Sequence, residues 1–201
     1  MNRHETDGAP TDPAGASAEA AGATTPGPAA LPAVVVIVSG VSGSGKSTVG
    51  GALARELGLP FLDGDALHPP ANVAKMAAGH PLDDADRRPW LAALAAHTAA
   101  MARARGGVVA CSALKRTYRD ELRDASPNVC FVQLVLGRAD AIDRVAHRPA
   151  HFMPAILIDS QFAGLEPLQP DEPGLIVDAM RPLRDKLDRV RAFVDGFRPA
   201  G

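Results

Sequence analysis

The chain has 201 residues, of which 46% are apolar and 22% charged, the balance of a folded globular domain with a substantial core. Lys and Arg together number 21 and Asp and Glu 23, and the resulting net charge of −2 argues against nucleic acid or an anionic membrane surface as a partner. No run reaches the roughly 18 apolar residues of a membrane span. Two cysteines, Cys111 and Cys130, are too few for a disulfide framework, so we expect a reducing, cytoplasmic setting.

The first stretch of the chain is poor in large apolar side chains. Residues 1–30 hold nine Ala, four Gly and four Pro, and Met1 is the only large apolar residue among them. Such a composition cannot bury enough surface to offset the entropy lost on ordering, so we predict a disordered tail over residues 1–31. It has neither the apolar segment of a secretory signal nor the basic residues of a transit peptide. The globular domain is expected over residues 32–198.

Beyond the tail, two kinds of pattern alternate along the chain. Short continuous apolar runs predict strands that are buried on both faces of a sheet, at residues 34–39, 59–62, 108–111, 129–136 and 175–177. Stretches with apolar residues on one helical face predict helices at residues 48–57, 90–105 and 183–197. Strands that alternate with helices predict an α/β fold with a doubly wound, mostly parallel sheet.

The first predicted strand and the first predicted helix are joined by the sequence GVSGSGKS, residues 40–47, which matches G-x-x-x-x-G-K-[ST]. In this motif the glycines let the backbone curl so that successive N–H groups converge on phosphate oxygens. Lys46 then reaches the β- and γ-phosphates, and the Ser47 hydroxyl binds Mg²⁺. The segment predicts a nucleoside triphosphate site formed by Gly40, Ser42, Gly43, Ser44, Gly45, Lys46, Ser47 and Thr48.

A phosphate loop alone fits a small-molecule kinase, a GTPase or a motor-type ATPase. The chain has no N-K-x-D guanine signature, and its D-x-x-G match at residues 171–174 lies near the C-terminus, where a simple turn is the better interpretation. The strand at residues 108–111 is followed by SALK rather than by the acidic residue typical of motor ATPases. These absences favour a small-molecule kinase, while a regulatory nucleotide switch stays open as the alternative from another class.

Two carboxylates follow the second predicted strand, in the sequence Asp63-Gly64-Asp65. Ligands of parallel sheets gather beyond the carboxyl ends of the strands, where the phosphate loop also lies. In an extended segment the two side chains would point the same way, one holding Mg²⁺ through its waters and the other accepting a proton from a hydroxyl. The polar, proline-rich stretch at residues 68–91 fits a region that covers a substrate.

Together these segments resemble the gluconokinases, P-loop small-molecule kinases related to shikimate kinase. The matching stretches are GVSGSGKSTVG (40–50), FLDGDALHPPANVAKMAAGHPLDDADRRPWL (61–91), CSALKRTYRDELR (111–123) and HFMPAILIDSQFAGLEPL (151–168). The resemblance implies ATP- and Mg²⁺-dependent phosphorylation of D-gluconate at its 6-hydroxyl. It also implies a P-loop kinase fold with a five-stranded parallel sheet flanked by helices on both faces, a mobile lid and a homodimer. A kinase for another small hydroxy acid or sugar acid is the alternative.

The resemblance also implies roles for individual residues. Asp65 would orient and deprotonate the 6-hydroxyl, and Asp63 would support the Mg²⁺ ion. The implied substrate contacts, besides Asp65, are His68, Arg87, Lys115 and His151.

The expected lid covers approximately residues 138–155. Arg144 and Arg148 lie four residues apart, so on a helix they share one face. Spacing alone leaves a solvated basic face equally open, but the resemblance favours two catalytic cations that close over the transferring phosphoryl group. Where the family commonly has Gly-His-Phe, this chain has Ala150-His151-Phe152, and the lost glycine would stiffen the hinge of the lid.

Overall fold

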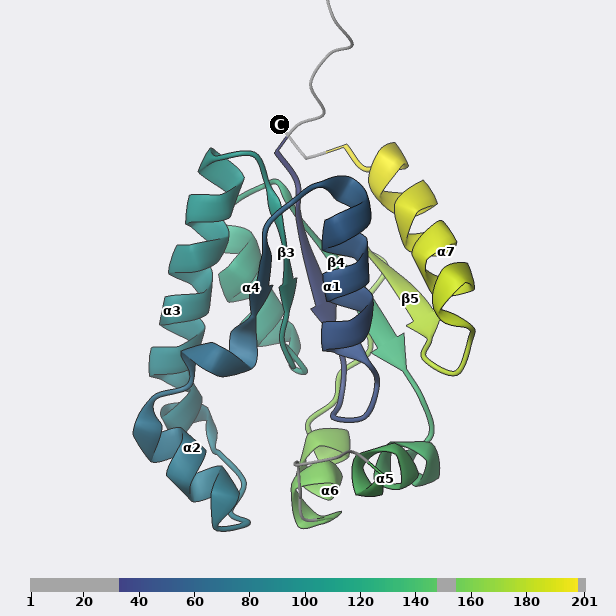
Figure 1. Cartoon of the computed structure of the whole chain (residues 1–201). Helices are drawn as coiled ribbons and strands as arrows, with labels where there is room; N and C mark the ends of the chain where they lie inside the picture. The colour runs from purple at the N-terminus through teal and green to yellow at the C-terminus, as the bar shows by residue number, and fades with distance from the viewer. Residues whose placement is uncertain (1–32, 148–154, 199–201) are drawn as a thin grey trace, which may run out of the picture. The chain divides into compact units, whose positions relative to one another are not determined.

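The computed structural model of the chain describes residues 33–147 and 155–198. Its centre is one five-stranded sheet in the order β2-β3-β1-β4-β5, with every neighbouring pair parallel (Figure 1). The strands are β1 (Val35–Ser39), β2 (Phe61–Asp63), β3 (Gly107–Ala110), β4 (Val129–Val135) and β5 (Gly174–Asp178). The predicted five-stranded parallel sheet is confirmed, and each predicted strand lies within two residues of an observed one.

Helices connect the strands and cover the sheet. They are α1 (Lys46–Leu57), α2 (Pro70–Ala77), α3 (Asp84–Arg103), α4 (Arg116–Asp124), α5 (Arg138–Ala146), α6 (Ala155–Ala163) and α7 (Leu183–Gly196), with a short 3₁₀ helix, η1 (Gly64–Leu67), directly after β2. The helices predicted at residues 48–57, 90–105 and 183–197 correspond to α1, α3 and α7. The predicted tail at residues 1–31 lies outside the described residues.

Each face of the sheet carries its own apolar core, because successive side chains of a strand point to opposite faces. On one face Val36 belongs to a cluster that includes Val190 of α7 and the apolar side of α1. On the other face Ile37 packs with Leu94 of α3 and Leu122 of α4. The strand between these two layers, β1, is fully buried along its length. Helices therefore flank both faces, as predicted.

The strand order changes direction at β1, since β3 and β2 lie on one side of it and β4 and β5 on the other. Ligands of open α/β sheets bind at such a switch point, beyond the carboxyl ends of the strands. In Figure 1 the strand arrows point toward the end of the domain where α2, α5 and α6 lie. This edge of the sheet is where a functional site is expected.

A buried ion pair holds two connections of the chain together. Arg119 of α4 and Glu172 are both fully buried, with Nε–Oε1 and Nη2–Oε2 distances of 2.6 and 2.9 Å. Arg119 also donates to the carbonyl oxygens of Leu114 and Glu166, each at 3.0 Å. The pair thus ties the loop after β3 to the segment between α6 and β5.

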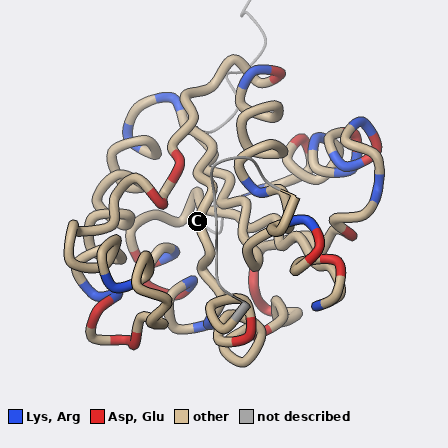
Figure 2. The backbone as a smooth tube through the Cα atoms, turned by 60° about the horizontal axis from the view of Figure 1, so that its bottom comes forward, with Lys and Arg blue, Asp and Glu red and all other residues tan. Residues whose placement is uncertain are grey.

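Charge is distributed over the surface without one dominant sign. Figure 2 shows basic and acidic positions interspersed along the described elements, in keeping with the near-neutral sum of charges. Over the described residues, none of the helices has the length and apolar character that crossing a membrane requires.

Candidate active site

The loop at residues 40–47 connects β1 to α1 and has the backbone that its glycines were expected to provide. Gly40, Gly43 and Gly45 have φ angles of 139°, 81° and 87°, a region that side chains rarely permit. A Cβ atom on Gly40 would lie 2.5 Å from the carbonyl oxygen of Leu134. A larger residue at position 40 would therefore push the loop away from β4, so the motif requires glycine there.

Polar groups of the loop are arranged for an anion. Lys46 is the first residue of α1, and its Nζ donates to the carbonyl oxygen of Val41 at 3.0 Å, so the ammonium folds back over the loop. Ser44 is fully buried, and its Oγ has no hydrogen-bond partner within the described part of the chain. Thr48 is exposed on the first turn of α1. The N-terminal end of this helix adds the positive end of its dipole, which favours a phosphate.

The end of β2 reaches the same loop through one hydrogen bond. The Ser47 Oγ donates to Asp63 Oδ2 at 2.7 Å, although β3 separates β2 from β1 in the sheet. A hydroxyl and a carboxylate are oxygen ligands of the kind that Mg²⁺ prefers. No group of three or more His, Cys, Asp or Glu side chains suited to a metal occurs among the described residues. A cation at Ser47 and Asp63 would therefore complete its shell with phosphate oxygens and water.

Asp65 does not lie in the extended segment that we expected. The chain turns into η1 directly after Asp63, whose Oδ1 accepts a hydrogen bond of 3.2 Å from the Asp65 backbone N–H. The carbonyl oxygen of Gly64 accepts a 2.8 Å hydrogen bond from Nε1 of the fully buried Trp90, which anchors the turn to α3. As a result the two carboxylates separate, with Asp63 on Ser47 and Asp65 on the wall of a cavity.

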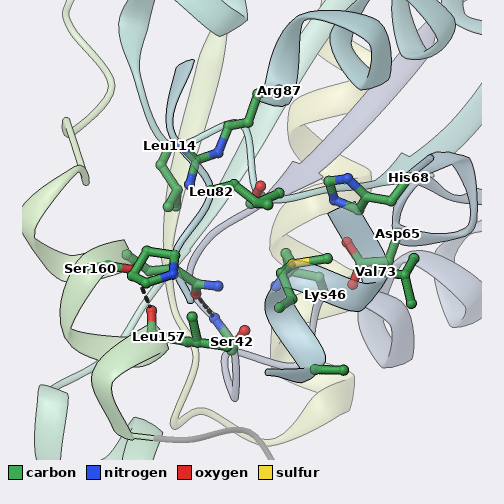
Figure 3. Close-up of a pocket in the computed structure, with 15 residues that line it drawn as sticks. Ser42, Lys46, Asp65, His68, Val73, Leu82, Arg87, Leu114, Leu157 and Ser160 are labelled. Carbon is green, nitrogen blue, oxygen red and sulfur yellow. Dashed lines mark hydrogen bonds between the residues drawn. The ribbon is translucent and has the colours of Figure 1, made fainter. Parts of the chain in front are cut away.

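That cavity has a volume of about 360 Å³, within the usual range for a small-molecule site. Figure 3 shows Lys46, Asp65 and His68 on one side of it and Leu157 and Ser160 on the other. Its polar lining includes Ser42, Lys46, Asp65, His68, Arg87, Ser112, Ser160 and Gln161, and its apolar lining Val73, Met76, Leu82, Leu114 and Leu157. The phosphate loop, the second carboxylate and two of the predicted substrate contacts thus meet in one cavity.

His68 is positioned by a ring stack. Its imidazole lies on the indole of Trp90, with ring centroids 4.8 Å apart and an angle of 9° between the planes. Burial lowers the pKa of His68, the charge of Asp65 acts in the opposite direction, and the charge of Arg87 lowers it further. Nδ1 is buried without a hydrogen-bond partner among the residues described. The neutral ring therefore offers a ring nitrogen to a ligand at pH 7.

The two predicted cations near α3 are placed differently. Arg87 lines the cavity, with Nη1 3.9 Å from Asp84 Oδ1. Lys115 is not part of the cavity lining, and its Nζ donates to both Asp84 oxygens, at 2.7 and 2.8 Å. The hydrogen bond to Asp84 raises the pKa of Lys115, and the same bond, with one from Tyr118, lowers the pKa of Asp84. Lys115 is thus held beside the site by a carboxylate.

Arg144 of α5 contacts the phosphate loop rather than the cavity. Its Nη1 donates to the carbonyl oxygens of Gly43, at 3.4 Å, and Ala179, at 3.3 Å, which links α5 to this loop and to the connection after β5. Arg148 and His151 lie outside the described residues, as does Ala150.

Sequence reasoning gave no role to Gln161, which the structure brings to the loop. Its Oε1 accepts a hydrogen bond of 2.7 Å from the backbone N–H of Ser42, 119 residues earlier in the chain. Trp90 is fully buried in the core, and it also anchors η1. No local motif points to either contact, since each joins segments that are distant in the sequence.

A phosphate loop at the switch point of a five-stranded parallel sheet, joined to an adjoining cavity with a carboxylate, defines a P-loop kinase for small molecules. The shikimate kinase family model matches residues 42–156, and the gluconokinase of Gluconobacter oxydans (strain 621H) is 50% identical over 139 residues, covering 69% of this chain and 78% of its own length. The chain belongs to the gluconokinase family.

Two further relatives agree with this assignment. The thermoresistant gluconokinase of Escherichia coli (strain K12) is 45% identical over 152 residues, which are 74% of this chain and 86% of that protein. The crystal structure of a gluconokinase from Sinorhizobium meliloti 1021 superposes with a TM-score of 0.75 at 43% identity, covering 82% of this chain and 93% of that one. The similarity in sequence and the similarity in fold therefore extend over the same domain.

Proposed function

We propose that this chain catalyses the ATP-dependent phosphorylation of D-gluconate at the 6-hydroxyl, giving 6-phospho-D-gluconate and ADP. One observation carries the proposal: Lys46 of the phosphate loop and Asp65 line a single cavity with Arg87, a cation able to pair with a carboxylate. Membership of the gluconokinase family supports gluconate as the acceptor.

In this proposal the triphosphate of ATP lies in the loop at residues 40–48. The backbone N–H groups of the loop and the N-terminus of α1 bind its oxygens. The ammonium group of Lys46 stabilises the negative charge of the β- and γ-phosphates. Where Mg²⁺ accompanies the nucleotide, Ser47 and Asp63 would hold it, and it would neutralise phosphate charge. Arg144 of α5, and Arg148 four residues later in the chain, are proposed to stabilise charge on the transferring group.

Asp65 is the proposed general base. As the 6-oxygen of gluconate forms its bond to the γ-phosphorus, the hydroxyl proton passes to the Asp65 carboxylate. The bond between the γ-phosphorus and the oxygen that bridges to the β-phosphate breaks, and ADP leaves with that oxygen. Phosphoryl transfer needs positioning and charge stabilisation above all, and the shared cavity supplies the positioning.

The remaining contacts are proposed to select the substrate. Arg87 offers bidentate geometry to the carboxylate of gluconate, and neutral His68 can both donate to and accept from its hydroxyl groups. Lys115 is a second proposed contact, which requires Asp84 to release it. His151 is proposed to contact gluconate from the expected lid at residues 138–155, which is itself a proposal.

A cytoplasmic homodimer completes the proposal. The two cysteines, Cys111 and Cys130, are free and buried, which accords with a reducing compartment. The homodimer is supported only by the resemblance to the family. The tail over residues 1–31 is proposed to be a disordered extension of the kinase domain at residues 32–198.

An ADP-release assay tests the function directly. The protein is incubated with ATP and Mg²⁺, with and without D-gluconate, and we expect ADP formation that depends on gluconate together with a phosphomonoester product in the ³¹P NMR spectrum. K46A is expected to abolish most turnover, whereas R191A, which removes a surface cation of α7, serves as the matched control and retains it. A rate of ADP formation that does not depend on gluconate but increases with shikimate or another hydroxy acid would overturn the choice of substrate.

A further inference from the structure

One backbone N–H group of the phosphate loop is bound by a side chain from a distant part of the sequence. The Ser42 backbone N–H donates to Gln161 Oε1 at 2.7 Å, a contact between residues 119 positions apart. In loops of this motif, backbone N–H groups and the helix N-terminus bind phosphate oxygens. A side chain has thus been brought from α6 to bind the loop at the point where it opens into the cavity, which Ser42 and Gln161 both line.

Because the Ser42 N–H can only donate, the Gln161 amide must present its oxygen to it. The amide nitrogen, Nε2, therefore points away from the loop and keeps both of its protons. Nε2 makes no hydrogen bond within the described residues, and it is absent from the buried polar atoms there that lack a partner, so solvent reaches it. An accepted hydrogen bond at the oxygen also polarises the amide and makes its N–H groups better donors.

The position of Gln161 is fixed by packing. Leu157 and Ile158, one turn earlier on α6, are buried, and Ile158 belongs to an apolar cluster with Val41 of the phosphate loop and Leu114. Residues three and four apart share a helix face, so Gln161 continues the face that packs against the loop. Its amide is consequently held in place before any ligand arrives, as a preorganised donor needs to be.

We infer that Gln161 is a catalytic residue that donates a hydrogen bond from Nε2 to the γ-phosphoryl group during transfer, while its Oε1 holds the Ser42 N–H of the phosphate loop. The inference rests on the proposed function for the identity of the acceptor, but the binding of the γ-phosphate can be measured without any acceptor. Gln161 lines the same cavity as Lys46 and Asp65, and in the proposed function the terminal phosphate meets the substrate oxygen in that cavity. A neutral amide suits this place, because a carboxylate would repel the phosphate.

The substitution Gln161→Glu separates the two roles inferred for Gln161, that of acceptor for the Ser42 N–H and that of donor to the γ-phosphoryl group. The variant keeps an oxygen acceptor for the Ser42 N–H but replaces the donor with a negatively charged oxygen. We expect thermal stability to stay close to that of the wild type and kcat to fall about 100-fold, the loss typical of a missing transition-state donor. Calorimetry in the presence of Mg²⁺ gives the Kd for a non-hydrolysable β,γ-imido ATP analogue and the Kd for ADP. The ratio of the first Kd to the second should rise at least about tenfold, which is about 1.4 kcal/mol.

Two companion variants complete the experiment. Gln161→Ala removes donor and anchor together, and it should lower kcat and also weaken ADP, because the loop loses its support. Gln169→Glu makes the same chemical change at an exposed position between α6 and β5 and should match the wild type in both Kd values. A Gln161→Glu variant with wild-type kcat, or with equal losses of affinity for ADP and the analogue, would overturn the inference and leave Gln161 as a support of the loop.

The nucleotide measurements also distinguish a failure of this inference from a failure of the proposed function. A wild-type protein that binds the analogue but does not phosphorylate gluconate would refute the substrate, while the ratio of the two Kd values would still report on Gln161.

Discussion

Substituting Trp90 with Phe tests how the core positions the site. The indole is fully buried, donates its N–H to the Gly64 carbonyl oxygen at 2.8 Å and stacks on His68. Phe removes the donor and leaves a buried acceptor unsatisfied, a loss of about 1–3 kcal/mol. The smaller ring loses roughly another 1 kcal/mol of packing. We therefore expect the free energy of unfolding to fall by about 2–4 kcal/mol.

The same change should affect catalysis more than nucleotide binding, because η1 carries Asp65 and His68 but not the phosphate loop. We expect kcat to fall at least about tenfold, since small displacements of reacting groups are costly, with little change in the Kd for ADP. Urea unfolding is followed by far-UV circular dichroism and not by tryptophan fluorescence, because Trp90 is the only Trp of the chain and W90F removes it.

A matched control separates stability from positioning. Val190 of α7 is fully buried in the core on the opposite face of the sheet, so V190A should lose a comparable amount of stability, about 2–3 kcal/mol, and keep its kcat. The reasoning is refuted if W90F retains wild-type kcat, or if V190A loses kcat to the same extent.

Two further predictions concern the metal and the buried ion pair. D63N should raise the Mg²⁺ concentration needed for half-maximal rate at least about tenfold, measured at saturating ATP, and an unchanged Mg²⁺ dependence would count against a role in holding the ion. E172Q leaves Arg119 buried without its counter-ion and should lower the free energy of unfolding by about 3–5 kcal/mol at pH 7. Burial acts to raise the pKa of Glu172, but the hydrogen bonds from Arg119 and the Gln169 N–H, together with the charges of Arg119 and Arg116, outweigh burial and hold that pKa below the usual 4.5. The pair therefore stabilises the fold above pH 4.5, and this contribution is lost as pH falls further. Urea midpoints of wild type and E172Q should therefore converge at acid pH, and a constant difference between them would contradict the assignment.

The sheet could be predicted because its signals are local. The strands β1, β3 and β4 are short apolar runs buried between two helical layers. The phosphate loop is recognised by the glycines that its curled backbone requires. The helix predicted at residues 90–105 in fact begins at Asp84, because Asp83 and Asp86 form a reciprocal capping box. The two aspartates that form it, three residues apart, are a signal present in the sequence.

Other features depend on contacts that no local pattern encodes. The turn that separates Asp63 from Asp65 needs Trp90, which lies 26 residues beyond Gly64. Lys115 was assigned to the substrate from the resemblance alone, and its pairing with Asp84 arises only when α3 and α4 pack together. The substrate, metal and lid roles given to individual residues stay predictions.

The role of Asp65 is the claim on which the proposed reaction depends, and D65N tests it most directly. The substitution preserves shape and removes the base, so kcat for gluconate should fall by a factor of about 100 to 10,000 while the Kd for the ATP analogue stays within about twofold of the wild type. Titration of the analogue and steady-state kinetics on the same preparation give both numbers. A loss of nucleotide affinity as large as the loss of kcat would make Asp65 a nucleotide or metal group and contradict the mechanism.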